Sequence, residues 1–196
     1  MKRLTAIIVS GMVAAIIAGC VSSPSRLYTL SPTTTPTAEQ TVGCIVSVGP
    51  VSVPAAVDRL QIVVRTGPNQ VFINEFDRWA SPLKGDIARV VATNLVSMLG
   101  TAHVTAFPAS SAADASYRVV IDVLRFDSEP DKAATMDVMW MVSATKGGHT
   151  RRNRTTLTEP TQGADYAALV AAHSRALGRI SSEIAAMIRE METKTR

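Results

Sequence analysis

The chain has 196 residues, of which 46% are hydrophobic, 5% aromatic and 18% charged, and its formal net charge is +4. This length is that of one ordinary domain, and the hydrophobic content is enough for one core filled mainly by aliphatic side chains. Without the two cations Lys2 and Arg3 the net charge of +4 falls to +2, which is too small to indicate nucleic acid as a partner.

The N-terminus has the order of regions found in a secretory signal peptide. Two cations precede an apolar run over residues 4–18, and a pair of small residues leads into Cys20. The run is shorter than the roughly 20 residues that a bilayer-spanning helix needs. The segment Ile17–Cys20 resembles a bacterial lipobox, which implies removal of residues 1–19 and acylation of Cys20 by fatty acids such as palmitate.

A disulfide between Cys20 and Cys44, the only two cysteines, is the alternative, because exported chains often pair their cysteines. An acylated Cys20 could not form it, and Cys44 would then be a lone thiol in a strand-like run. We expect Cys44 to behave as a small buried hydrophobe. Val21 follows the cysteine, and resemblance to lipoprotein sorting in enteric-type bacteria favours the outer membrane, on its periplasmic face.

Residues 20–41 are rich in serine, threonine and proline, which predicts a flexible tether ahead of a domain at 42–196. About 20 extended residues would span roughly 60 Å. One island, Arg26–Leu30, alternates in polarity, so we expect it to dock on the domain as an edge strand that ends before Pro32.

The first half of the domain reads as strands followed by a helix. We expect a strand over Val42–Val53 with a kink at Gly49–Pro50, and a hairpin formed by Leu60–Arg65 and Gln70–Asn74. Apolar residues then recur at helical spacing, which predicts a helix. Its expected signals are Ser81 as N-cap, Pro82 as first residue, and Gly100 as the stop.

The second half predicts four further strand candidates and a long helix. Tyr117–Phe126 is apolar on both faces, which is typical of a central strand covered on both sides. The helix is expected over Ala164–Met191, with His173 on its apolar stripe and therefore in the core. The remaining strand candidates are His103–Phe107, Ala134–Thr145 and Arg151–Thr158.

The order of these elements predicts an α/β fold, namely a mixed β-sheet with two long α-helices packed on it in a single domain. Lys146–Arg154 is the one dense basic segment, and Gly147–Gly148 within it predicts a hairpin turn. A solvated hairpin tip is the simplest interpretation, and a surface for phospholipid headgroups or an acidic partner is the alternative.

Nothing in the sequence indicates catalysis, a cofactor or a metal site. The three histidines are isolated, and the spacings of zinc, redox, acyl-transfer and phosphate-binding motifs are absent. A periplasmic hydrolase is therefore the weakest alternative. Asp58, Asp77 and Asp127 do not cluster, and we expect each to fix a loop by pairing with an arginine.

An aromatic and charged group, Phe76–Trp79, precedes the first predicted helix on what reads as a short connection. Tryptophan and arginine are enriched at interface hot spots, which favours a binding role. The alternative is a loop that plugs the core, with Trp79 covering apolar side chains and Asp77 capping. The sequence leaves both interpretations open.

Three segments, Val48–Pro54, Asp58–Val63 and Glu75–Leu83, resemble the PqiC-type ABC-transport auxiliary lipoproteins. The resemblance continues in the same order over essentially the whole mature chain, although the polar, basic stretch after Gly147 departs from it. The further matching segments are Arg26–Leu30, Asn94–Leu95, Tyr117–Val119, Arg125–Asp127 and Asp165–Val170.

This resemblance implies an outer-membrane lipoprotein that serves a system in which MCE-domain proteins move lipid between two membranes. Its expected role is non-catalytic docking of an MCE-domain partner, with assembly into a homo-oligomeric ring. The alternative is a lipid-binding lipoprotein, with an acyl chain held between the sheet and the last helix. The motif positions that we carry over as candidates for partner binding are Asp58, Arg59, Phe76, Asp77, Arg78 and Trp79.

Overall fold

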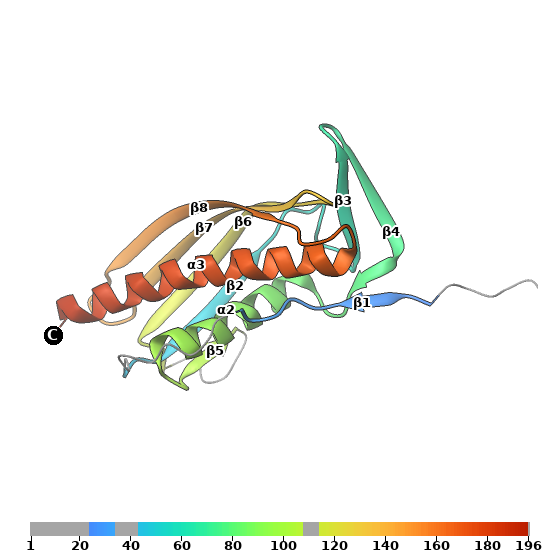
Figure 1. Ribbon diagram of the computed structural model, residues 1–196. Coiled ribbons are helices and arrows are strands. Elements are labelled where there is room, and N and C mark those ends of the chain that lie inside the picture. Colours follow the sequence, from blue (N-terminus) through green and yellow to red (C-terminus); the bar gives the residue numbers. More distant parts are fainter. Residues whose placement is uncertain (1–23, 34–42, 108–113, 196) are drawn as a thin grey trace, which may run out of the picture.

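A computed structural model describes residues 24–33, 43–107 and 114–195. The signal peptide, Cys20 and most of the predicted tether lie outside the described residues, as does most of the loop after Phe107. The described strands form two sheets, and two long helices pack on the larger one (Figure 1). This arrangement confirms the α/β class and the two helices, whereas the strands divide between two sheets where one was predicted.

The larger sheet has five strands and is mixed, as predicted. In spatial order the strands are β5 (Val104–Ala106), β2 (Val46–Ser52), β6 (Tyr117–Glu129), β7 (Ala133–Ala144) and β8 (Thr150–Pro160). β2 runs parallel to both β5 and β6, whereas β6, β7 and β8 are antiparallel neighbours, so β6 is the central strand.

The smaller sheet has the order β1 (Arg26–Tyr28), β4 (Gln70–Trp79) and β3 (Gln61–Gly67). β3 and β4 form the predicted hairpin, which projects away from the body of the molecule (Figure 1). β1 pairs with the far edge of β4 in parallel register, so the predicted edge strand is confirmed. β4 is longer than expected because it continues through the Phe76–Trp79 segment, which therefore lies in a strand and not on a short connection.

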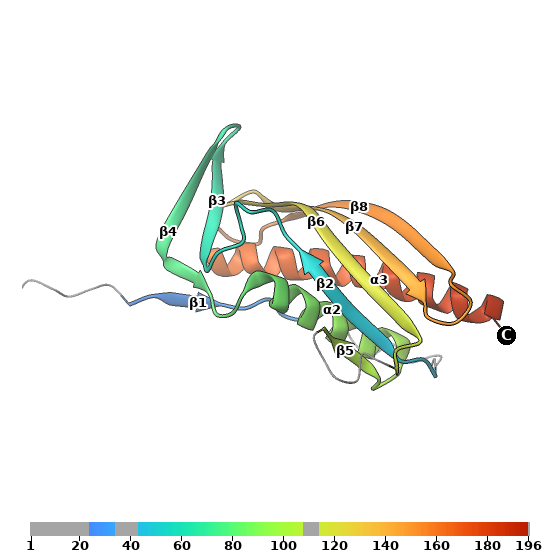
Figure 2. The ribbon, with the colours of Figure 1, turned by 180° about the vertical axis from the view of Figure 1, so that it is seen from behind.

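The two helices are α2 (Leu83–Leu99) and α3 (Tyr166–Thr195), and both cover the same face of the five-stranded sheet (Figures 1 and 2). Gly100 ends α2 with a left-handed φ of 65°, as predicted. Ser81 is not the N-cap: Pro82 occupies that position, without a side-chain capping bond. No helix in the described part of the chain has the length and apolarity needed to cross a membrane.

The core fills the space between the five-stranded sheet and the helices. Its fully buried side chains include Ile121 of β6, Leu95 of α2 and Ile184 of α3, and each contributes about 1.5–3 kcal/mol by leaving water. Neither helix covers the other face of the sheet, and among the described residues Leu124 and Met139 on it are 46% and 43% exposed. The prediction that β6 is covered on both faces is therefore wrong, because both helices pack on one side.

The predicted kink in β2 is present and depends on a glycine. Gly49 has a φ of 121° and precedes a cis peptide bond to Pro50, and the pairing of β2 with β6 shifts register between Val48 and Val51. A Cβ atom on Gly49 would lie 2.9 Å from the Cβ of Phe107. Both the backbone conformation and the close approach of the next segment therefore require glycine here.

Candidate functional site

Asp77 is the centre of a buried hydrogen-bond network that joins β1 to β4. Its side chain is fully buried and accepts two bonds of 2.7 Å from Nε and Nη2 of Arg26. The hydroxyl of Tyr28 donates to Oδ1 at 2.8 Å, and Nδ2 of Asn74 donates to Oδ2 at 2.6 Å. Burial and then the bond to Asp77 raise the pKa of Tyr28 to about 12. The expected pairing of Asp77 with an arginine is confirmed, and this network holds the N-terminal strand.

A second buried carboxylate, Asp86 in α2, fixes the residues after β1. Its Oδ2 accepts from the backbone N–H of Leu30 at 2.7 Å, and Arg89 bonds both Asp86 and the carbonyl of Leu30. Leu30 is buried in the core, and the N–H of Thr33 donates to Asn94 at 3.3 Å. Residues 26–33, which fall inside the predicted tether, therefore pack as part of the folded body.

Trp79 lies in the core, at one end of a stack of rings from three elements. It is 4% exposed and packs edge-on against Phe126, which stacks on His173 with a centroid distance of 3.8 Å. His173 shares a 2.8 Å hydrogen bond with Ser128, and burial lowers its pKa to about 3. His173 is therefore a neutral core histidine, as predicted, and the burial of Trp79 agrees with the core-plug interpretation.

The other four candidates for partner binding have partly or fully exposed side chains. Asp58 pairs with Lys84 at 2.6 Å, so the expected arginine partner is wrong for this carboxylate. Arg78 donates from Nε to the carbonyl of Glu75 at 2.7 Å, and both Phe76 and Arg59 are exposed. The structure thus separates the six candidates into two buried residues, Asp77 and Trp79, and four accessible ones.

Exposed apolar side chains surround the accessible candidates. Arg78 pairs with Leu27 of β1 on one side and with Gln61 of β3 on the other. Phe76 lies two residues before Arg78, hence on the same side of the strand. We call Leu27, Arg59, Leu60, Phe76 and Arg78 the hairpin-base surface; three of the five are large exposed hydrophobic residues.

The hairpin is also held to the larger sheet by charge pairs. Arg65 of β3 donates from Nε and Nη2 to the two oxygens of Asp127 at 3.1 and 3.2 Å, and Arg125 adds a bond of 2.5 Å. Burial opposes ionisation of Asp127, but the bonds from Arg65 and Arg125 outweigh it and lower its pKa. The prediction that arginine fixes Asp127 is confirmed, and the consequence is a rigid attachment of the hairpin.

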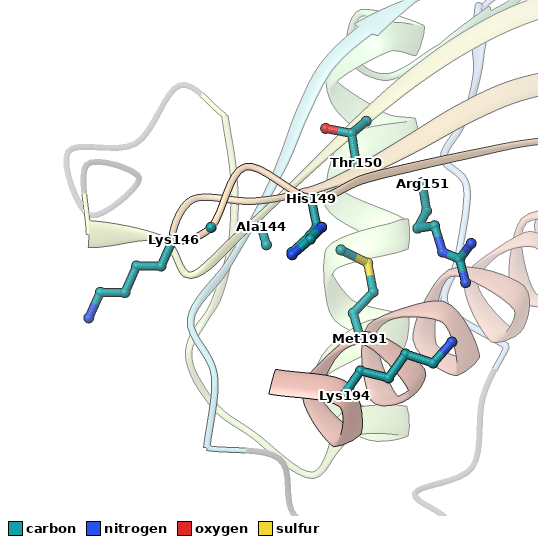
Figure 3. Close-up of a pocket in the computed structure, with 8 residues that line it drawn as sticks. Ala144, Lys146, His149, Thr150, Arg151, Met191 and Lys194 are labelled. Atoms are coloured by element: carbon teal, nitrogen blue, oxygen red, sulfur yellow. The ribbon is translucent and has the colours of Figure 1, made fainter. Parts of the chain in front are cut away.

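A pocket of about 580 Å³ lies at the opposite end of the molecule, between the turn joining β7 to β8 and the end of α3 (Figure 3). Lys194 and Arg151 both reach the same oxygen of Glu190, at 2.6 and 2.9 Å, and lower its pKa, the bond from Lys194 acting most. The residues that line the pocket are Ala144, Lys146, Gly147, His149, Thr150, Arg151, Met191 and Lys194. The sequence marked the basic hairpin, but no local pattern could bring Met191 and Lys194 to it.

The described residues hold no candidate metal site, and much of the apolar face of α3 is packed into the core. No group of three or more histidine, cysteine, aspartate or glutamate side chains among them could hold a metal ion. Leu177, Ile180 and Ile184 of α3 are fully buried in the core that it shares with the sheet. Cys44 is free and buried, and burial raises its pKa to about 11, which disfavours the reactive thiolate.

The chain matches one protein family and is similar in fold to solved structures. Residues 28–185 match the family described as the ABC-type transport auxiliary lipoprotein component. A solved structure described only as an uncharacterized protein is similar at a TM-score of 0.69 and 21% identity, covering 85% of this chain and 99% of its own. A Xanthomonas campestris crystal structure is similar at a TM-score of 0.68 and 20% identity, covering 87% of this chain and 100% of its own. No curated protein sequence matches.

Proposed function

Because the chain belongs to the family of ABC-type transport auxiliary lipoprotein components, we propose that it is a docking component of an MCE-type lipid transport system. In this proposal acyl chains on Cys20 hold it at the periplasmic face of the outer membrane. It performs no catalysis, and an MCE-domain protein that reaches across from the inner membrane binds the folded domain.

The hairpin-base surface is the observation that supports docking. Phe76 is 42% exposed on β4, whose conformation is fixed by Asp77, and Leu60 is 47% exposed just before β3. Holding an apolar surface rigid before binding reduces the entropy that association must overcome. Aromatic and arginine side chains such as Phe76 and Arg78 are enriched among the residues that dominate binding energy.

Asp58, next to Arg59, extends this surface at the loop that leads into β3. Both residues are exposed and belong to the segment that resembles the family motif, so we include them among the partner-binding residues. Asp77 and Trp79 contribute to docking only by fixing β4, because neither side chain reaches the surface. A ring of copies, which the resemblance implies, would repeat the hairpin-base surface around one axis.

Crosslinking and co-purification of the full-length, membrane-anchored chain with an MCE-domain protein from its own cell envelope test the docking role. We expect Phe76→Ser to reduce the recovered partner several-fold while the melting temperature stays within a few degrees. Phe107→Ser is the matched control, since Phe107 is also exposed but follows β5 on the other sheet. Equal partner recovery in wild type and Phe76→Ser would contradict this surface, and no partner in any sample would contradict docking itself.

The anchor needs a separate test. Cys20→Ser should move the chain from the outer-membrane fraction to the soluble periplasmic fraction, and intact-mass analysis of the wild type should show fatty acyl groups on the first residue. Release of the unaltered wild-type chain, or a mass without acyl groups, would remove the anchored part of the proposal.

A further inference from the structure

We propose that the pocket between the β7–β8 turn and the end of α3 binds a phosphate-bearing headgroup of an anionic amphiphile, with its apolar stem against Met191 and Ala144 (Figure 3). The assignment of this ligand as transported lipid rests on the proposed function. The binding of a phosphate group rests only on the charges and shape of the pocket.

The charge around the pocket is not neutralised by the described residues. Glu190 is the one acidic partner of both Arg151 and Lys194, and each of these cations remains about half exposed or more. Lys146 and His149 form no side-chain hydrogen bond or ion pair with any described residue, and Arg152 bonds only the sulfur of Met141. An anion that entered the pocket would therefore meet a positive field with unused donors.

The donors come from different parts of the chain and surround a hollow. Arg151 is the second residue of β8, and Lys194 lies in the last turn of α3. His149 belongs to the turn between the strands and points toward Met191 (Figure 3). Lys146 points away from the other lining side chains, so it adds to the field without reaching the centre. Convergence of cations on one concave volume is typical of a small-molecule site.

The floor and the volume favour a lipid over an acidic protein surface. Met191 and Ala144 give the pocket an apolar lining beneath its cations, and a volume of about 580 Å³ lies within the usual range of roughly 300–1,000 Å³ for ligand pockets. A flat acidic protein patch would leave this hollow empty. A phospholipid would fill the pocket, with its headgroup at the cations and the first part of its acyl region on the apolar lining.

The pocket is far from the end of the molecule that follows Cys20. Tyr28 of β1 contacts Tyr166 at the start of α3, with a ring-centroid distance of 6.1 Å, whereas Lys194 lies near the end of that helix. A helix rises about 1.5 Å per residue, so roughly 40 Å separate the two ends. The pocket thus lies at the end of the molecule away from β1 and from the predicted anchor.

The test follows the methyl resonance of Met191 in the full-length chain held in amphipol. The three probes are dihexanoyl phosphatidylglycerol, dihexanoyl phosphatidylcholine and inorganic phosphate. We expect the phosphatidylglycerol to shift this resonance saturably, the phosphatidylcholine to act much more weakly, and inorganic phosphate to compete poorly. Removing a charge-assisted donor in Lys194→Gln or Arg151→Gln should weaken binding about tenfold, while Lys132→Gln, which changes an exposed cation at the opposite end of β7, should leave it unchanged.

Each other outcome overturns a defined part of the proposal. Equal binding of the phosphatidylcholine, or unchanged binding in both glutamine variants, would remove the anionic site. Inorganic phosphate binding as tightly as the lipid would assign the pocket to free phosphate and overturn the lipid assignment. No lipid binding, combined with loss of an MCE-domain partner in Lys194→Gln, would assign the pocket to an acidic protein surface. Failure of docking alone would appear as lost partner recovery with the titration intact.

Discussion

The two ends of this molecule use charge in opposite ways. At the β1 end, the buried carboxylates Asp77 and Asp86 are each surrounded by donors and the surface above them is apolar. At the far end of α3, cations outnumber the carboxylate of Glu190 around an open pocket. The paired carboxylates at the β1 end fix the fold beneath a surface suited to a protein partner. The excess cations at the far end of α3 are available to bind an anionic ligand.

The largest loss of stability at the β1 end is expected for Trp79→Ala, which removes the ring at one end of the aromatic stack. We expect a loss of about 3–5 kcal/mol in the free energy of unfolding, because the substitution leaves a cavity next to Phe126. Urea denaturation followed by circular dichroism measures it. A loss below about 1 kcal/mol, together with lost partner binding, would instead return Trp79 to an interface role.

Asp77→Ala should cost about 2–3 kcal/mol, since it leaves Tyr28 and Asn74 without their acceptor, while Arg26, which is largely exposed, regains water. The same denaturation measures the loss, and hydrogen exchange should show β1 opening first. Asp58→Ala is the control: its pair with Lys84 is exposed, so its loss should stay below about 1 kcal/mol. Equal losses in the two variants would contradict a structural role for the buried network.

Acid should weaken the β1 end through His173. Its pKa is lowered to about 3 from an ordinary 6.5, so between these values the unfolded chain binds a proton that the folded chain does not. Stability is therefore unaffected above pH 6.5 and falls by about 1.4 kcal/mol per pH unit as the pH drops below it. Denaturation midpoints from pH 7.5 to 5 measure this slope, and His173→Gln should flatten it. A wild-type slope equal to that of the variant would contradict a neutral buried His173.

The smallest effect is expected at the pocket end. Glu190→Gln removes the negative charge that pairs with two exposed cations and should leave the denaturation midpoint nearly unchanged. The same variant should tighten phosphatidylglycerol binding in the Met191 titration, because it frees Arg151 and Lys194. Weaker binding, or a large loss of stability, would show that the end of α3 is a structural cluster like the one around Asp77.

Local patterns in the sequence were sufficient for most of the elements. The apolar repeat of α2, its stop at Gly100, the kink at Gly49 and the core position of His173 all follow from spacing and backbone chemistry. The division into two sheets did not, because it depends on β4 continuing through Phe76–Trp79 to pair with β1. One-sided burial of β6 was also missed, since apolar residues such as Leu124 do not show which face the helices cover.

The sequence predicted the candidate surfaces only in part, because it does not show which side chains become buried. Residue type and the family resemblance made all four residues of Phe76–Trp79 binding candidates, but the side chains of Asp77 and Trp79 are buried. Asp86 looked like an ordinary acidic residue in a first helical turn, and its partner Leu30 lies far away in sequence. Long-range pairings of this kind leave no periodic trace in a single sequence.

The pairing of β1 with β4 limits how far the folded body can lie from the membrane that would anchor Cys20. Only residues 21–25 lie between Cys20 and β1, and a fully extended chain of that length reaches about 20 Å, a third of the roughly 60 Å estimated for a free segment up to residue 41. If Cys20 is acylated, this short segment would keep the folded body close to the bilayer surface. A counterpart approaching from the inner membrane would have to cover nearly all of the gap itself.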